Sequence, residues 1–322
     1  MKLIDKLKLE KKVEEIANYD LQNNNIAGTA YFVWQNGETV CKKHFGKVSL
    51  NSDVDVSDKT MYRMASMTKP ITTVALMILV DRGLVSLDDE VSKYIPEFSD
   101  AHIITEDGKD LGKTKTPVTI LHCLSHSAGF GCMKEYAMTD ESRQTKDAMI
   151  KCYLDAGLDF EPFTKDMYSG WGAHGVVAKI IEVVTGEDFG EFLKKEIFIP
   201  CDMQDTTFSP TEEQWKRFIM MHDKVDGKNA ESETYPGCVF ENFPCEHNLA
   251  GAGLASTIED YSKFAIMLCN MGEINGKRIV SEEAVKKIST PCIKKTPLYE
   301  SESWGLSVRI ITDSEGYAEK TV

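Results

Sequence analysis

The stretch MYRMASMTKPITTVALMILVDRG, residues 61–83, joins a short polar segment to a long apolar run. Ser66 lies three residues ahead of Lys69, and Pro70 follows directly. The apolar run predicts a buried helix over residues 70–82. Because proline has no N–H with which to bond the carbonyl of Ser66, this serine is confined to the start of the helix. Backbone N–H groups at that position favour negative charge beside Ser66.

Two interpretations of Ser66 and Lys69 follow. Residues three apart on a helix share a face, so the amine of Lys69 can reach the hydroxyl of Ser66. A serine becomes a nucleophile when a base removes its proton, and a lysine serves as that base only when burial or a neighbouring cation lowers its pKa. The alternative is a helix-capping serine beside a surface lysine. This stretch alone leaves both interpretations open.

The composition is typical of a globular protein with an excess of negative charge. Hydrophobic residues make up 42% of the 322 residues, enough for a sizeable core, and the formal net charge is -14. This acidic balance argues against binding nucleic acid or an anionic membrane through charge. The longest apolar run, residues 74–80, is far shorter than the ~20 residues that a membrane span needs.

The cysteines and histidines predict neither a disulfide framework nor a metal site. The nine cysteines are scattered and contain no C-x-x-C pair. His122 and His126 are four residues apart but lack the acidic residue of an H-E-x-x-H site. The first residues alternate apolar and charged positions, so we expect no secretory signal. We therefore predict reduced thiols, no metal or other cofactor, and a cytoplasmic protein.

Turn signals and periodicity divide the chain into a sheet region and a mainly helical region. Asn36-Gly37 predicts a hairpin, and Asn275-Gly276 predicts a second turn. Helical patterns occupy most of residues 61–199 and all of 257–271, residues 224–237 favour a loop, and residues 303–313 alternate like a strand that returns to the sheet. We predict an α+β fold in which residues 1–60 and 250–322 form the sheet region and residues 61–249 the mainly helical region of one domain.

Five blocks keep the order and spacing of a known superfamily. They are residues 62–98, 118–130, 168–186, 200–208 and 250–280, and they include ASMTK, SHSAG, YSG and GAGL. Over about residues 26–310 the chain resembles the serine β-lactamase and penicillin-binding-protein superfamily, most closely its class C-like branch of esterases and D-alanyl-D-alanine peptidase homologues. The resemblance implies a β-lactamase-like fold, with an antiparallel sheet flanked by helices.

The same resemblance implies roles for residues at matched positions. Ser66 matches the acylating serine, Lys69 the lysine that helps to deprotonate it, and Tyr168 the tyrosine that relays the proton to the leaving group. A phenol with a pKa of about 10 needs a nearby cation to act as a base at neutral pH. The alternative for Tyr168 is a core tyrosine with a satisfied hydroxyl. His126 matches a structural histidine, and residues 251–254 match a glycine-rich turn that lets the backbone pass behind the site.

The sequence departs from the family pattern in two places. Gly170 stands where relatives commonly have the asparagine of Y-x-N, which favours the esterase-like relatives over those that act on β-lactams or peptides. The K-T-G or H-x-G motif that follows the WGLSVRI strand in relatives is not matched before Val322, and the terminal KTV is not that motif in context. We therefore expect a fragment that lacks sheet strands and one oxyanion-hole donor, whose loss typically costs ~2.7–4 kcal/mol of transition-state stabilisation.

The predicted function is that of a serine hydrolase that cleaves an ester or amide bond of a small molecule through an acyl-enzyme, esterase-like rather than a true β-lactamase. Two alternatives stay open. Gly170 and the missing strands would also suit a non-catalytic binding module with this fold. A penicillin-binding peptidase of the cell wall would require export.

Overall fold

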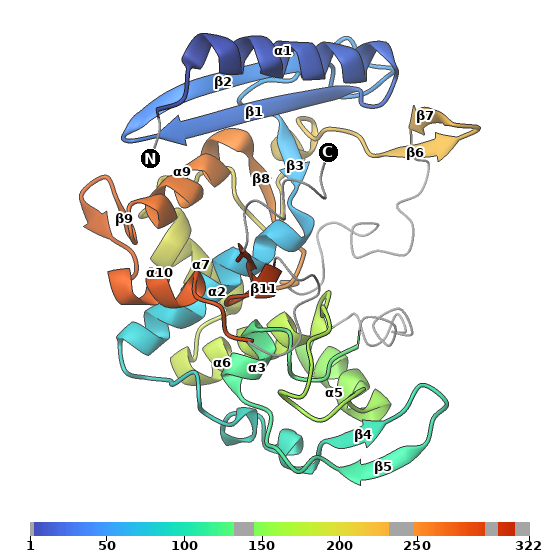
Figure 1. Ribbon diagram of the computed structural model, residues 1–322, viewed down its shortest axis with the longest axis vertical. Coiled ribbons are helices and arrows are strands. Elements are labelled where there is room, and N and C mark those ends of the chain that lie inside the picture. Colours follow the sequence, from blue (N-terminus) through green and yellow to red (C-terminus); the bar gives the residue numbers. More distant parts are fainter. Residues whose placement is uncertain (1–2, 132–144, 232–247, 294–301, 313–322) are drawn as a thin grey trace.

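A hairpin flanked by helices forms one end of the molecule. The computed structural model describes residues 3–131, 145–231, 248–293 and 302–312, in which β1 (Gly28–Gln35) pairs antiparallel with β2 (Glu38–Gly46). Asn36 and Gly37 take the left-handed φ values of 52° and 89° that a tight hairpin turn requires, so the hairpin predicted there is confirmed. Helix α1 (Lys6–Gln22) lies along the hairpin, and α9 (Ile258–Cys269) contacts β1 (Figure 1).

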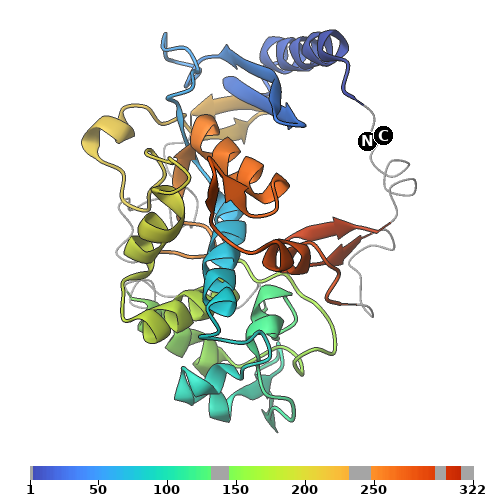
Figure 2. The same ribbon diagram turned by 90° about the vertical axis from the view of Figure 1, so that its left-hand side faces the viewer.

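Helix α2 (Thr68–Asp81) runs through the centre of the molecule (Figure 2). Its residues 71–79 are apolar apart from two threonines, and all of them are buried. Helices α6 (Gly172–Thr185), α7 (Phe189–Leu193) and α10 (Glu282–Ile288) contact it. A helix surrounded by others is apolar on every face, which explains the unbroken apolar run in the sequence. The helix predicted over residues 70–82 is therefore confirmed, with a start two residues earlier.

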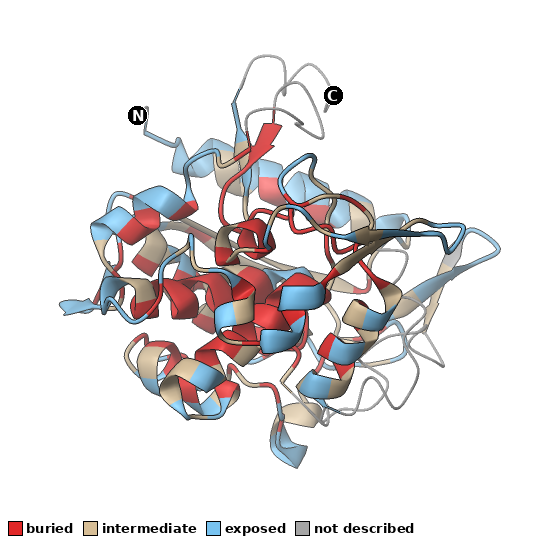
Figure 3. Ribbon diagram, turned by 90° about the horizontal axis from the view of Figure 1, so that it is seen from below, coloured by how far each residue is buried: buried red, intermediate tan, exposed pale blue. Residues whose placement is uncertain are grey.

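The remaining helical segments surround this centre. They are α3 (Ile120–Leu124), α5 (Lys146–Ala156) and α8 (Glu212–Trp215), three 3-10 helices (Ala65–Met67, Val91–Lys93 and Pro96–Asp100) and a π-helical turn (Lys194–Phe198). Buried residues concentrate in the central helices, whereas α1 is largely exposed (Figure 3). One buried apolar cluster includes residues from Met64 to Leu306, so the two ends of this range share a core. Within the described ranges, no helix is long and apolar enough to cross a membrane.

The described strands form six two-stranded sheets. Besides β1 and β2, the pairs are β3 (Met61–Arg63) with β8 (Ala255–Thr257), β4 (His102–Ile104) with β5 (Asp110–Lys113), β6 (His222–Val225) with β7 (Lys228–Glu231), β9 (Glu273–Ile274) with β10 (Lys277–Arg278), and β11 (Glu302–Trp304) with β12 (Arg309–Ile311). The β9–β10 hairpin confirms the turn predicted at Asn275-Gly276.

Two predictions about strands are wrong. Of the strand predicted over residues 303–313, the described residues 303–312 do not return to the N-terminal sheet as one strand, because the chain reverses over residues 305–308. There the Gly305 N–H donates to the Val308 carbonyl at 2.9 Å, and Ser307 takes a left-handed φ of 62°. The loop predicted over residues 224–237 is wrong for residues 224–231, which belong to a hairpin of residues 222–231 that turns at Asp226-Gly227; residues 232–237 lie outside the described residues. Residues 320–322, with the terminal KTV, lie outside the described residues.

Candidate active site

Ser66 lies where strand β3 passes into helix α2. The 3-10 helix Ala65–Met67 joins the two elements, and Pro70 falls in the first turn of α2. Ala65 has a left-handed φ of 45°, a backbone conformation that is costly for a residue with a Cβ and that recurs at functional sites. The turn leaves Ser66 exposed at the surface, while the helix behind it is buried. The serine is thus presented to solvent by a rigid support.

Lys69 is buried directly behind Ser66, with 1% of its surface exposed. Its Nζ lies 3.2 Å from Ser66 Oγ, 2.6 Å from the Gly170 carbonyl and 2.8 Å from the Gly251 carbonyl. These three acceptors match the three donors of an ammonium group. Lysine is almost never fully buried without such partners, so this environment is built around the Lys69 side chain. The interpretation of Lys69 as a surface lysine is therefore wrong.

Tyr168 reaches the same serine from the segment before α6. Its phenol donates a hydrogen bond of 2.5 Å to Ser66 Oγ, and Lys69 Nζ lies 4.9 Å from the centre of its ring. The structure therefore brings together all three residues that the sequence singled out, although Tyr168 is 102 residues from Ser66. Ser66 Oγ is in contact with both an amine and a phenol, the two groups that could exchange a proton with it.

A glycine-rich segment, residues 251–254, passes close behind the site as expected. A Cβ on Gly251 would lie 2.6 Å from the Gly170 carbonyl oxygen and 3.0 Å from the Cα of Trp171, so a side chain has no space there. Further along, the Leu254 N–H donates to Thr68 Oγ1 at 3.2 Å. The close approach lets the Gly251 carbonyl accept from Lys69.

Two buried histidines lie beside Tyr168 and Lys69. The Ser169 N–H donates to His126 Nδ1 at 3.2 Å, and His174 Nε2 lies 2.8 Å from the hydroxyl of Ser307. Burial, and second to it the charge of Lys69, lowers the pKa of His126 to about 3. Burial, then Lys69 and His126, also holds the pKa of His174 well below its usual range. Both rings are therefore neutral near pH 7 and act through packing and hydrogen bonds.

The sequence did not single out Trp304 or Ser307, which also belong to this region. Trp304 in β11 lies 4.5 Å from His126 and 6.0 Å from Tyr168 between ring centres. Ser307 follows in the β11–β12 turn and contacts His174. Both fall in the WGLS stretch, which the sequence presented only as an alternating strand. Serine is not a residue type that indicates a left-handed φ, so the turn at Ser307 was not predicted from the sequence.

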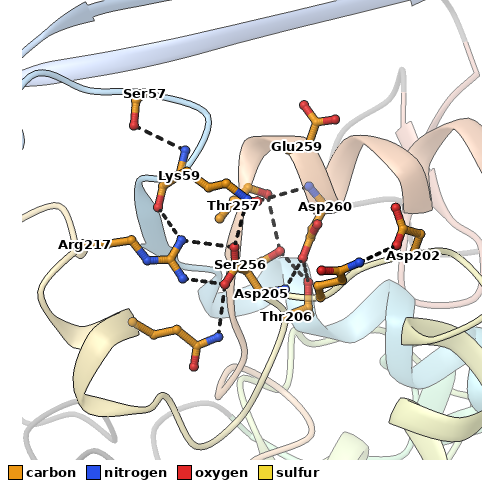
Figure 4. Close-up of polar contacts among 12 residues, drawn as sticks. Ser57, Lys59, Asp202, Asp205, Thr206, Arg217, Ser256, Thr257, Glu259 and Asp260 are labelled. Atoms are coloured by element: carbon orange, nitrogen blue, oxygen red, sulfur yellow. Dashed lines mark hydrogen bonds and ion pairs between the residues drawn. The ribbon is translucent and has the colours of Figure 1, made fainter.

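A separate polar cluster lies near the start of α9 and does not include Ser66, Lys69 or Tyr168 (Figure 4). Asp205 pairs with Arg217, and the Asp205 N–H donates to Asp260 Oδ2 at 2.6 Å. Burial raises the pKa of Asp260, whereas hydrogen bonds from Arg217 lower the pKa of Asp205. These bonds tie the segment before α8 to α9, which indicates a structural role. Nearby, a hollow of about 800 Å³ between α7 and α8 is lined in part by Thr206, but not by Ser66.

Among the residues that the structure describes, no group of three or more histidine, cysteine, aspartate or glutamate side chains is placed to hold a metal ion.

Comparisons with known proteins identify the family of this chain. The family model described as Beta-lactamase matches residues 9–292. An uncharacterized protein of Mycobacterium tuberculosis is 24% identical over 307 residues, covering 89% of this chain and 76% of that protein. A putative D-alanyl-D-alanine carboxypeptidase of Escherichia coli K12 is 26% identical over 275 residues, covering 80% of this chain and 62% of that protein.

Solved structures give the same fold. The structure of EstCE1, a hydrolase with promiscuous acyltransferase activity, superposes with a TM-score of 0.81 at 19% identity, covering 97% of this chain and 85% of that one. The β-lactamase-like α+β fold predicted from the sequence is therefore confirmed. Because the family model spans most of the chain, and the fold agrees with it, the protein belongs to the beta-lactamase family.

Proposed function

We propose that this protein is a serine hydrolase that cleaves an ester or amide bond through an acyl-enzyme on Ser66. One observation carries the proposal: Ser66 Oγ lies 3.2 Å from Lys69 Nζ and 2.5 Å from Tyr168 Oη at an exposed helix start. A nucleophile in contact with two proton-exchanging groups, one of them buried, is the arrangement that nucleophilic catalysis requires.

The contacts of Lys69 suit a base. A neutral amine has two N–H donors and one lone pair. The carbonyls of Gly170 and Gly251 would take the two N–H donors, which leaves the lone pair for the hydroxyl proton of Ser66. The same three contacts therefore serve the charged and the neutral amine, so Lys69 can accept the proton without moving.

The reaction then follows in balanced steps. Ser66 Oγ attacks the substrate carbonyl while its proton passes to Lys69, and a tetrahedral oxyanion forms. The oxyanion collapses, the bond to the leaving group breaks, and Tyr168 donates its proton to the leaving oxygen or nitrogen, regaining one from Lys69. Water then attacks the acyl group by the reverse sequence and releases the acid.

Gly170 supports esters over amides as substrates. Its carbonyl is occupied by Lys69, and it offers no side chain with which to hydrogen-bond a substrate amide. A site that recognises an amide must pair the amide's polar groups, whereas an ester needs fewer such contacts.

A covalent probe tests the proposal. A fluorophosphonate reacted with the full chain should attach to the peptide that contains Ser66, as mapped by mass spectrometry, and Ser66→Ala should abolish the attachment. No attachment to the folded protein would overturn the proposal in favour of a non-catalytic binding module, and attachment that survives Ser66→Ala would overturn it by placing the reactive group elsewhere.

We also propose a reducing, cytoplasmic location. Six described cysteines are free thiols, namely Cys41, Cys123, Cys152, Cys201, Cys269 and Cys292. A protein exposed to an oxidising compartment seldom keeps this many unpaired cysteines. Fractionation of the source cells, with thiol counting on the isolated protein, tests this proposal; recovery outside the cytoplasm would contradict it.

A further inference from the structure

The contacts around Tyr168 extend beyond the three residues proposed to react. We infer that Trp304 is a positioning residue, which, together with His126, holds the ring of Tyr168 in place against Ser66. This inference rests on the proposed function, because it explains how the Tyr168 hydroxyl is kept on the nucleophile. It makes the β11–β12 hairpin part of the site through Trp304, which lies 238 residues after Ser66 in the sequence.

Three rings form a mutual cluster at this point. Trp304 lies 6.0 Å from Tyr168 at an interplanar angle of 25°, and 4.5 Å from His126 at an angle of 62°. The third pair, His126 and Tyr168, is separated by 4.8 Å. Trp304 is 5% exposed and His126 is 2% exposed, so both are fixed by the core. Offset-stacked and edge-to-face ring pairs of this kind restrict the orientation of an aromatic side chain.

The Trp304 side chain is itself fixed to the segment that carries Tyr168. Its Nε1–H donates to Asp166 Oδ2 at 3.1 Å. Asp166 is only two residues before Tyr168. The indole therefore contacts this short segment twice, once through its face and once through its N–H. A phenylalanine at position 304 would keep the first contact and lose the second.

The hairpin is held in turn to the helix that carries Lys69. Thr73 Oγ1 donates to Ser307 Oγ at 2.8 Å, and the Ser307 N–H donates to the Leu124 carbonyl at 2.7 Å. Thr73 lies four residues after Lys69, one turn along the same face of α2. The left-handed φ of Ser307, which is unfavourable for serine, is maintained by these buried bonds. The hairpin therefore contacts both the segment that carries Tyr168 and the helix that carries Lys69, and holds the two residues in position relative to each other.

The experiment compares three variants of the full chain. Trp304→Leu removes the indole, Trp304→Phe keeps an aromatic face without the N–H, and Phe189→Leu truncates another buried ring, which packs against Phe208 in the core. The acylation rate constant and KM are measured with p-nitrophenyl butyrate. Labelling of each protein with 3-fluorotyrosine, with the Tyr168 signal assigned through Tyr168→Phe, gives a fluorine NMR readout of the Tyr168 ring that needs no turnover.

We expect Trp304→Leu to lower the acylation rate constant ~10- to 100-fold with little change in KM, because a small misplacement of a reacting group costs this much. Its Tyr168 fluorine signal should move toward that of free fluorotyrosine. Trp304→Phe should retain most of the rate and the signal, and Phe189→Leu should change neither. The inference is overturned if Trp304→Leu leaves the rate or the Tyr168 signal unchanged, or if Trp304→Phe loses as much as Trp304→Leu. Failure of the proposed function would be seen separately, as a wild-type protein without acylation.

Discussion

The phenol of Tyr168 donates a 2.5 Å hydrogen bond to Ser66 Oγ, and Lys69 Nζ contacts the same oxygen at 3.2 Å. One oxygen therefore meets two proton-exchanging groups that come from different elements of the fold.

Replacing Tyr168 with phenylalanine removes only the hydroxyl and keeps the ring contacts with Trp304 and His126. Because general acid and base groups typically contribute 10²–10⁴-fold, we expect the acylation rate constant for p-nitrophenyl butyrate to fall by ~10²- to 10⁴-fold. Thermal unfolding should be little changed. A variant that acylates at the wild-type rate would show that Tyr168 has no part in proton transfer.

Replacing Lys69 with methionine removes the amine from its three acceptors. We expect the acylation rate to fall at least ~10²-fold, since no other amine is in contact with Ser66 among the described residues. Lys263→Met is a matched control, because Lys263 pairs with Asp202 at 3.0 Å on the surface of α9. Stopped-flow kinetics measure the acylation rate constant of each variant. A rate constant for Lys69→Met equal to that of Lys263→Met would contradict a catalytic role for the Lys69 amine.

Gly251→Ala introduces a methyl group where its Cβ would lie 2.6 Å from the Gly170 carbonyl oxygen. The backbone must move, and both carbonyls that bind Lys69 must move with it. We expect a loss of ~1–3 kcal/mol in the free energy of unfolding, measured with urea, together with slower acylation. Unchanged stability would mean that the close approach of these segments is relaxed in solution.

The buried histidines predict how stability depends on pH. Burial, and then Lys69, lowers the pKa of His126 to about 3, so in the folded state the ring stays neutral at pH values where the unfolded chain takes up a proton. Stability should therefore fall as the pH drops below the ordinary histidine pKa of about 6.5 toward 3. His174 acts in the same direction.

The contribution of one ring can be isolated by substitution. Between about pH 4 and pH 6, His126→Gln should reduce the slope of the unfolding free energy against pH by about 1.4 kcal/mol per pH unit relative to the wild type. Urea denaturation at several pH values measures both slopes. An equal slope in the two proteins would mean that His126 is protonated in the folded state.

Local rules predicted the parts of the site that lie close together in sequence. Helix geometry allows Ser66 and Lys69 to share a face, and Pro70 fixes the start of the helix. The hairpin at Asn36-Gly37 follows from the need of its turn for left-handed residues. These features depend on a few neighbouring residues, so no knowledge of the rest of the fold is required.

Contacts between residues far apart in the sequence were harder to predict. The meeting of Tyr168 with Ser66 was inferred from a family resemblance, because nothing local indicates which tyrosine reaches a serine 102 residues away. The Gly170 and Gly251 carbonyls that accept from Lys69 belong to the backbone, so no side chain in the sequence identifies them. Trp304 was missed because period-two alternation predicts a strand but does not indicate that its side chain contacts Tyr168, His126 and Asp166, all far away in the sequence. The hairpin at Asp226-Gly227 had a local signal, which the polar composition of its surroundings concealed.

The most direct test of the central claim is to detect the acyl group on Ser66. The full chain is mixed with excess p-nitrophenyl butyrate, the release of p-nitrophenol is followed in the first turnover, and the acid-quenched protein is digested and analysed by mass spectrometry. We predict a burst close to one equivalent per chain and a butyryl group on the peptide that contains Ser66, both absent in Ser66→Ala. A butyryl group on another residue, or a folded protein that forms no acyl-enzyme with esters, would contradict the account.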